Sequence, residues 1–256
     1  MNDVQVQKDN RNVALKKVGI KDLKWPIKVM DKNQGTQNTV GTLELSVDLP
    51  SDVRGTHMSR FIEMANDMES LNPGSLETLL KKLKTRLHAK MAYCKIEFDY
   101  FVKKPSPVTG TLSPNNVVCT FEAELDDKFF FLMKVDVPVS TLCPCSKEIS
   151  EFGAHNQRAT VSMEIMMNKL IWIEELVEIA DESASSPIYS LLKREDEKFV
   201  TEKAYLNPRF VEDTVREVSL RLDALDGVTW YSVHVESIES IHNHNAFAYT
   251  EKEYNV

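Results

Sequence analysis

Three runs of alternating apolar and polar residues constrain the fold of this chain more than any other feature. Apolar side chains alternate with charged ones from Cys94 to Val102, and the pattern returns in residues 117–125 and 129–137. Alternation with a period of two is typical of half-buried β-strands. The short segment Asp126-Asp127-Lys128 joins the last two runs, which predicts a hairpin and therefore antiparallel pairing.

The remaining elements form two comparable sets along the chain. Strands are predicted at residues 39–49, 159–165, 231–235 and 246–250, and helices at residues 76–87, 173–180 and 207–225, the last opening at Asn207-Pro208 and ending at Gly227. Hairpins, rather than regular strand-helix-strand alternation, predict an α+β fold with largely antiparallel sheets. We expect an irregular N-terminal arm over residues 1–36 and two modules, residues 37–137 and 138–256, with the boundary near Val137.

Composition excludes some classes of function. The 256 residues include 31 Lys and Arg against 39 Asp and Glu, a formal charge of −8 that disfavours a broad nucleic-acid-binding surface. The longest apolar stretches, residues 129–133 and 170–173, fall far short of the roughly 20 residues that a membrane helix needs. Residues 1–10 lack the apolar core of a signal peptide, so we expect a cytoplasmic protein. From the charge balance and the short apolar stretches, we expect that it binds neither nucleic acid nor membranes.

Two of the four cysteines point to metal chemistry. Cys94 and Cys119 occupy apolar strand positions and are interpreted as small buried hydrophobes. Cys143 and Cys145 flank a proline and are followed by His155 in a polar segment between strands. Thiolate and imidazole are ligands that zinc-like ions prefer. The alternatives are a turn with a buried thiol, or a redox pair, which the spacing across a proline would strain.

Other polar residues complete the candidate site. Glu195 and Glu197 lie in the charged run of residues 193–198, and His242 and His244 precede the last predicted strand. An open metal site needs three protein ligands and a water molecule, which one thiolate, one imidazole and one carboxylate would supply. The alternatives are a solvated charged surface for the run and turn residues for the histidines. Spacing does not decide between the two cysteines or between the two glutamates.

Five separated motifs resemble one enzyme family, the type IB GTP cyclohydrolases, from about residue 20 to the C-terminus. These motifs are Gly55-Thr-His-Met-Ser-Arg-Phe61, Ser140-Thr-Leu-Cys-Pro-Cys-Ser-Lys147, Gly153-Ala-His-Asn-Gln-Arg158, Asp196-Glu-Lys-Phe-Val200 and Ser240-Ile-His-Asn-His-Asn245. The resemblance implies two tandem tunnelling-fold modules, each an antiparallel sheet with helices layered on one face. It also implies a homotetramer with active sites at subunit interfaces. The implied reaction opens GTP at C8, releases formate and forms 7,8-dihydroneopterin triphosphate, the first step toward tetrahydrofolate.

The resemblance also implies the metal ligands. It makes Cys143, His155 and Glu197 the protein ligands of one divalent ion per active site, with water in the remaining position. In the related type IA enzymes, the corresponding metal site is expected to contain a second thiolate in the place of this carboxylate. A carboxylate in that place lowers the preference for zinc and admits manganese or ferrous iron, so the expected ion is Mn, Fe or Zn.

Roles for the substrate follow in the same way. The resemblance makes Cys143, His242 and Glu212 the catalytic residues, with His242 exchanging a proton at N7 of the purine and His244 assisting. Glu212 would accept the N1–H and 2-amino groups of guanine; the alternative is a first-turn glutamate favoured by the helix dipole. Provisional contacts to the triphosphate are His57, Ser59 and Arg60, expected at the end of a strand.

Two rival functions stay open. One is an archaeal-type relative that also opens GTP but yields a cyclic phosphate of dihydroneopterin. The other is a non-catalytic protein in which Cys143, Cys145 and His155 form a closed structural metal site.

Overall fold

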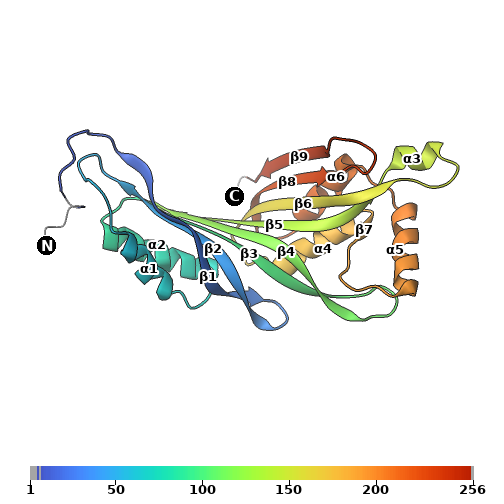
Figure 1. The fold of residues 1–256 in the computed structure, drawn as a ribbon, viewed down its shortest axis with the longest axis horizontal. Coiled ribbons are helices and arrows are strands. Elements are labelled where there is room, and N and C mark those ends of the chain that lie inside the picture. Colours follow the sequence, from blue (N-terminus) through green and yellow to red (C-terminus); the bar gives the residue numbers. More distant parts are fainter. Residues whose placement is uncertain (1–4, 6, 255–256) are drawn as a thin grey trace. The chain divides into compact units, whose positions relative to one another are not determined.

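The alternating runs form long antiparallel strands in the computed structural model, which describes residues 5 and 7–254 (Figure 1). The strands are β1 (Leu15–Asp31), β2 (Gly35–Leu49), β3 (Ala92–Pro105), β4 (Leu112–Leu125), β5 (Phe129–Leu142), β6 (Asn156–Met167), β7 (Ser186–Pro187), β8 (Val228–Ser237) and β9 (Ala246–Glu253). The helices are α1 (Met58–Asn66), α2 (Pro73–Leu87), α3 (Pro144–Ile149), α4 (Ile173–Ser183), α5 (Arg194–Leu206) and α6 (Val211–Asp223). Hydrogen-bonded neighbours follow the order β1-β2-β3-β4-β5-β6-β8-β9, and β7 pairs with β5. The fold class is therefore α+β, as predicted.

The chain divides into two compact units. One comprises residues 1–99 and 120–132, and the other comprises residues 100–119 and 133–256. Because β3, β4 and β5 each contribute residues to both units, the division does not fall at one point of the chain. The predicted modules, residues 37–137 and 138–256, are a different division and remain a prediction.

In the first unit, β1 and β2 form a hairpin and β2 pairs with β3. Helix α2 begins at Pro73, three residues before the predicted start at residue 76, because Asn72 caps it: the Ser75 N–H donates to Asn72 Oδ1 at 2.9 Å, and the Asn72 N–H donates to Ser75 Oγ at 3.0 Å. Leucines at the expected three- and four-residue spacing are buried on this helix (Leu76, Leu79, Leu80 and Leu83).

Two features of this unit differ from expectation. Residues 15–31, assigned to an irregular arm, form β1 and pair with β2 along most of their length. The alternation of Leu23, Trp25, Ile27 and Val29 explains the strand. Residues 57–60, expected at a strand end, instead begin helix α1, with His57 as its N-cap.

In the second unit, β5, β6, β8 and β9 pair antiparallel in that order. Helices α4 and α6 cover one face of this sheet, as Figure 1 shows. The core between this sheet and the two helices is built from fully buried apolar residues. They come from β6 and β8 (Val161, Met163, Val233 and Val235) and from the helices (Leu176, Ala180, Val218 and Leu222).

The second unit also contains helices that the sequence did not predict. Residues 193–198 begin helix α5, and residues 144–149 form the short helix α3. Asn207, expected to start a helix, ends α5 instead, and α6 begins at Val211 with Phe210 as N-cap. The Asn207 amide donates to the carbonyl oxygen of Ala184 at 3.0 Å, so its side chain fixes the end of α5 rather than capping α6. Within the described part of the chain, no helix is long and apolar enough to span a membrane.

Candidate active site

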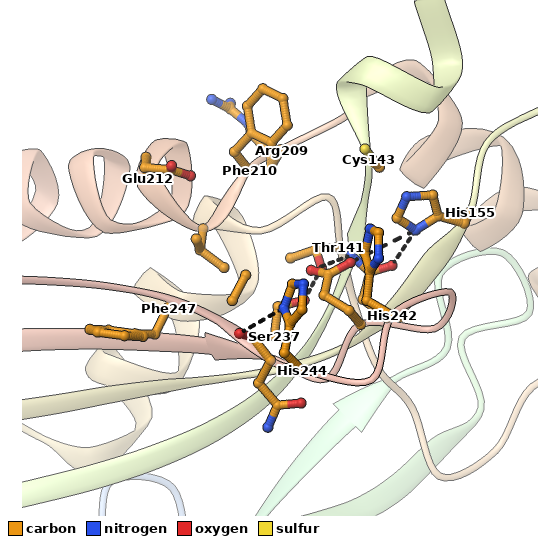
Figure 2. A pocket seen from close by; sticks show the side chains of 15 residues that line it. Thr141, Cys143, His155, Arg209, Phe210, Glu212, Ser237, His242, His244 and Phe247 are labelled. Atoms are coloured by element: carbon orange, nitrogen blue, oxygen red, sulfur yellow. Dashed lines mark hydrogen bonds and ion pairs between the residues drawn. The ribbon is translucent and has the colours of Figure 1, made fainter. Parts of the chain in front are cut away.

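A cavity of about 470 Å³ opens in the second unit, where strands β5, β6 and β8 end beside the start of α6 (Figure 2). Small-molecule sites in proteins are typically ~300–1,000 Å³. Predicted residues that line it are Cys143, His155, Glu212, His242 and His244. The fold therefore gathers five of the nine predicted site residues, from four separate segments of the chain, around one space.

Cys143 and His155 are held together by backbone and side-chain hydrogen bonds. The Cys143 N–H donates to the His155 carbonyl oxygen at 3.1 Å. Ser146 contacts both residues: its N–H donates to Cys143 Sγ at 3.5 Å, and its hydroxyl accepts the His155 N–H at 3.2 Å. A sulfur and an imidazole, two donors suited to zinc-like ions, thus face the same cavity from fixed backbone positions.

The imidazole of His155 has a further partner inside the cavity. His155 Nδ1 lies 2.9 Å from Gln157 Oε1, and Gln157 Nε2 donates to Glu239 Oε1 at 3.3 Å. Gln157 and Glu239 also line the cavity, and sequence reasoning missed both. The signal for Gln157 was available, because residues two apart at a strand start share a face and His155 was already a candidate.

His242 and His244 lie in the segment between β8 and β9, on the opposite side of the cavity from α6 (Figure 2). Their rings stack with centroids 5.0 Å apart and an interplanar angle of 10°. Both side chains are exposed, so each can exchange protons with solvent and with a molecule in the cavity. The structure thus brings the two histidines to the same space as Cys143 and His155.

Glu212 lies in the first turn of α6 and is exposed to the cavity. Arg209, which sequence reasoning missed, lines the cavity beside it. The Arg209 N–H donates to the Leu142 carbonyl oxygen at 3.1 Å, and its guanidinium lies 3.3 Å from Glu217 Oε1. The cavity lining therefore includes one guanidinium cation, in a protein whose net charge is negative.

The other predicted residues lie elsewhere. Glu197 is exposed in the first turn of α5 and does not line the cavity. Among the residues that the structure describes, no group of three His, Cys, Asp or Glu side chains is placed to hold a metal ion. His57, Ser59 and Arg60 belong to the first unit and do not line this cavity. Cys145 is exposed and likewise outside the lining.

Comparison with known proteins decides the family. The family model described as type I GTP cyclohydrolase FolE2 matches residues 1–248. The chain belongs to this family. Curated relatives named GTP cyclohydrolase FolE2 include one from Caldicellulosiruptor bescii, 58% identical with 99% of both chains covered. Another, from Thermotoga maritima, is 57% identical with 98% of this chain and 97% of the relative covered. FolE2 is the type IB family, so the resemblance seen in the five motifs is confirmed.

Solved structures agree with the fold alone. Uricase from Arthrobacter globiformis superposes with a TM-score of 0.56 over 94% of each chain at 7% identity. Urate oxidase from Bacillus sp. TB-90 gives a TM-score of 0.54, with 94% of this chain and 100% of that chain covered, at 8% identity. Identity this low shows a shared architecture of sheet and helices and no more.

Proposed function

We propose that this FolE2 protein, a GTP cyclohydrolase of folate biosynthesis, carries out its reaction at the cavity of Cys143 and His155. The reaction converts GTP and water to formate and 7,8-dihydroneopterin triphosphate. The observation that carries the proposal is the convergence of Cys143, His155, Glu212 and the two stacked histidines on one space in a chain of this family. A cytoplasmic location is proposed with it, since GTP is a cytoplasmic nucleotide.

We propose Cys143, His155 and Glu197 as ligands of one divalent ion, with Mn, Fe or Zn as candidates. The donor chemistry supports this, because a thiol and an imidazole already face one cavity. When bound, such an ion lowers the pKa of a water molecule to about 7 and so supplies hydroxide for attack on C8. The first turn of α5, in this chain or in a second copy, must approach the cavity for Glu197 to take part.

The chain's own side chains account for proton transfer and base recognition. His242 is proposed to exchange a proton with N7 as the imidazole ring of the purine opens, with His244 stacked against it. Glu212 is proposed to accept the N1–H and 2-amino groups of guanine. Adenine lacks these donors and would leave the carboxylate unpaired, so the same contact would reject it.

The triphosphate contacts and the assembly are proposals too. His57, Ser59 and Arg60 are proposed to contact the triphosphate, in a homotetramer with active sites at its subunit interfaces, and Arg209 offers a cation within the cavity itself. The finer architecture, two tandem tunnelling-fold modules each with its own antiparallel sheet, is proposed on the family resemblance.

Turnover with product analysis tests the proposed function. Purified protein is stripped with a chelator, reloaded separately with Mn²⁺ and Zn²⁺, and incubated with GTP while formate and pterin fluorescence are followed. A pterin with an intact triphosphate supports the proposal, whereas a cyclic phosphate assigns the archaeal-type reaction. Unfolding on chelation, without turnover in any reloaded sample, would assign a structural metal site.

A further inference from the structure

We propose that Gln157 and Glu239 are positioning residues that hold the neutral imidazole of His155 in its Nδ1–H tautomer. This inference rests on the proposed function, because it assigns the Nε2 lone pair of His155 to the divalent ion. Neither residue belongs to the predicted metal ligands or to the substrate contacts.

The register of the sheet places these three side chains together. Strands β6 and β8 pair with Ala159 opposite Ser237, and the Ile238 N–H continues the ladder by donating to the Arg158 carbonyl oxygen at 2.9 Å. Continued two residues past Ser237, the end of β8, this register places Gln157 opposite Glu239. Because side chains two residues apart on a strand share a face, His155 lies on the same face as Gln157.

The hydrogen bonds run in one direction along this group. Gln157 Oε1 lies 2.9 Å from His155 Nδ1, and Gln157 Nε2 donates to Glu239 Oε1 at 3.3 Å. The second carboxylate oxygen of Glu239 is 4.0 Å from His155 Nδ1, too far for a direct hydrogen bond. The side chains of His155 and Glu239 are only 14% and 12% exposed, so water competes little for these contacts.

The carboxylate determines the direction of the whole group. An ionised carboxylate only accepts hydrogen bonds, so the Gln157 amide must turn its nitrogen toward Glu239. Its oxygen then faces the imidazole and can only accept, so Nδ1 must carry the proton. In a neutral imidazole this leaves Nε2 unprotonated and able to bind a cation.

Without this arrangement the imidazole would divide between two tautomers. A flipped Gln157 amide would present N–H to Nδ1, place the ring proton on Nε2 and remove the lone pair that metal binding needs. Ligating histidines elsewhere commonly donate their second ring N–H to a carboxylate or carbonyl, and losing that partner typically costs about 10–100-fold in metal affinity.

The test compares four variants for Zn²⁺ affinity by chelator competition. Gln157→Leu removes the acceptor, and Glu239→Leu removes the group that orients the amide. We expect each to raise the Zn²⁺ dissociation constant about 10–100-fold. The double exchange Gln157→Glu with Glu239→Gln again places an acceptor toward Nδ1 and should return affinity to within about threefold of wild type. Asn156→Leu, an exposed neighbour outside the cavity lining, is the matched control and should bind as wild type does.

A second readout does not depend on metal or activity. The ¹⁵N chemical shifts of His155 in metal-free protein, recorded where the imidazole is neutral, report the tautomer directly. Wild type and the double exchange should show the Nδ1–H form, and Gln157→Leu a mixture. Unchanged shifts and unchanged Zn²⁺ affinity in Gln157→Leu would overturn the inference. Failure of folded wild-type protein to bind Zn²⁺ or Mn²⁺ would instead count against the proposed function.

Discussion

Cys143 and His155 face each other across the end of an antiparallel ladder. Strands β5 and β6 pair with Leu142 opposite Asn156, and the Cys143 N–H extends this register by donating to the His155 carbonyl oxygen at 3.1 Å. The distance between the backbones of Cys143 and His155 is therefore determined by the pairing of β5 with β6, which is stiff, rather than by the loop between them. Sites held by regular strands and helices are more precise than sites held by loops.

The two cysteines of the motif should behave differently. Cys143→Ala removes a sulfur from the cavity, and we expect it to abolish both stable metal binding and turnover. Cys145→Ala should keep most of the bound metal, because Cys145 is exposed and outside the cavity lining. Metal content after reloading and gel filtration, measured by atomic emission, checks this. Loss of metal from the Cys145 variant alone would reverse the assignment of the ligand.

Glu212 should govern recognition of the base. Glu212→Gln loses a charged acceptor for the guanine edge, and hydrogen bonds to charged groups contribute about 1.5–3 kcal/mol. We expect kcat/KM for GTP to fall about 10–100-fold with metal content unchanged. The control is Glu202→Gln, another exposed glutamate, which lies on α5 and outside the cavity lining. Unaltered kcat and KM in the Glu212 variant would remove it from the binding site.

Asp196 should make the start of α5 sensitive to acid. Its carboxylate is fully buried and accepts hydrogen bonds from the N–H groups of Val108, Thr109 and Lys193 and from the Thr109 hydroxyl. Burial alone would raise the pKa of Asp196, but these hydrogen bonds outweigh it and hold the pKa well below its usual value. The carboxylate joins the β3–β4 turn to the turn of α5 that carries Glu197.

The sign of the pH effect follows from that lowered pKa. The contribution of Asp196 to stability is fully present above the unfolded-state pKa of about 3.9 and is lost as pH falls through the folded value. Asp196→Asn should therefore lower the melting temperature most at neutral pH, and the difference from wild type should shrink below about pH 4. Thermal unfolding from pH 7 to pH 3 measures it. A difference that stays constant or grows in acid would contradict the prediction.

Local patterns predicted the strands other than β1 and β7, and two of the helices, well. The alternation around Phe98 and the hairpin at Asp126 are short-range signals, and so is the leucine spacing after Asn72. Helix α5 was missed because its charged first turn contains one buried residue, Asp196, whose partners come from a distant turn. The start of α6 was misplaced because the Asn207 side chain bonds to Ala184, a contact that exists only in the folded chain.

The sequence predicted the types of side chain in the site, but only some of the residues that line the cavity. The motifs marked four residues of the cavity lining: Cys143, His155, His242 and His244. The pairing of the strands then brought them together. Glu239 and Arg209 carried no local signal, because their proximity to the cavity depends on how β8 and the α5–α6 connection end. Glu197 shows the converse: it belongs to a motif, but the structure does not place it in the cavity lining.

The N-terminal strand β1 depends on a residue without a side chain. Gly19 pairs with Ser46 of β2 beside a register shift of β1, and a Cβ atom there would overlap the carbonyl oxygen of Leu45. We expect Gly19→Ala to push the two strands apart and lower the free energy of unfolding by about 1–3 kcal/mol. Because the obstacle is backbone, no side-chain rotation can relieve it. Amide hydrogen exchange should accelerate in β1 and β2 while the protection of β6 and β8 is unchanged.

Gly74→Ala, near the start of α2 with its nearest contact at 3.4 Å, is the matched control and should be neutral or slightly stabilising. Equal protection of β1 in both variants would show that β1 tolerates a side chain at Gly19.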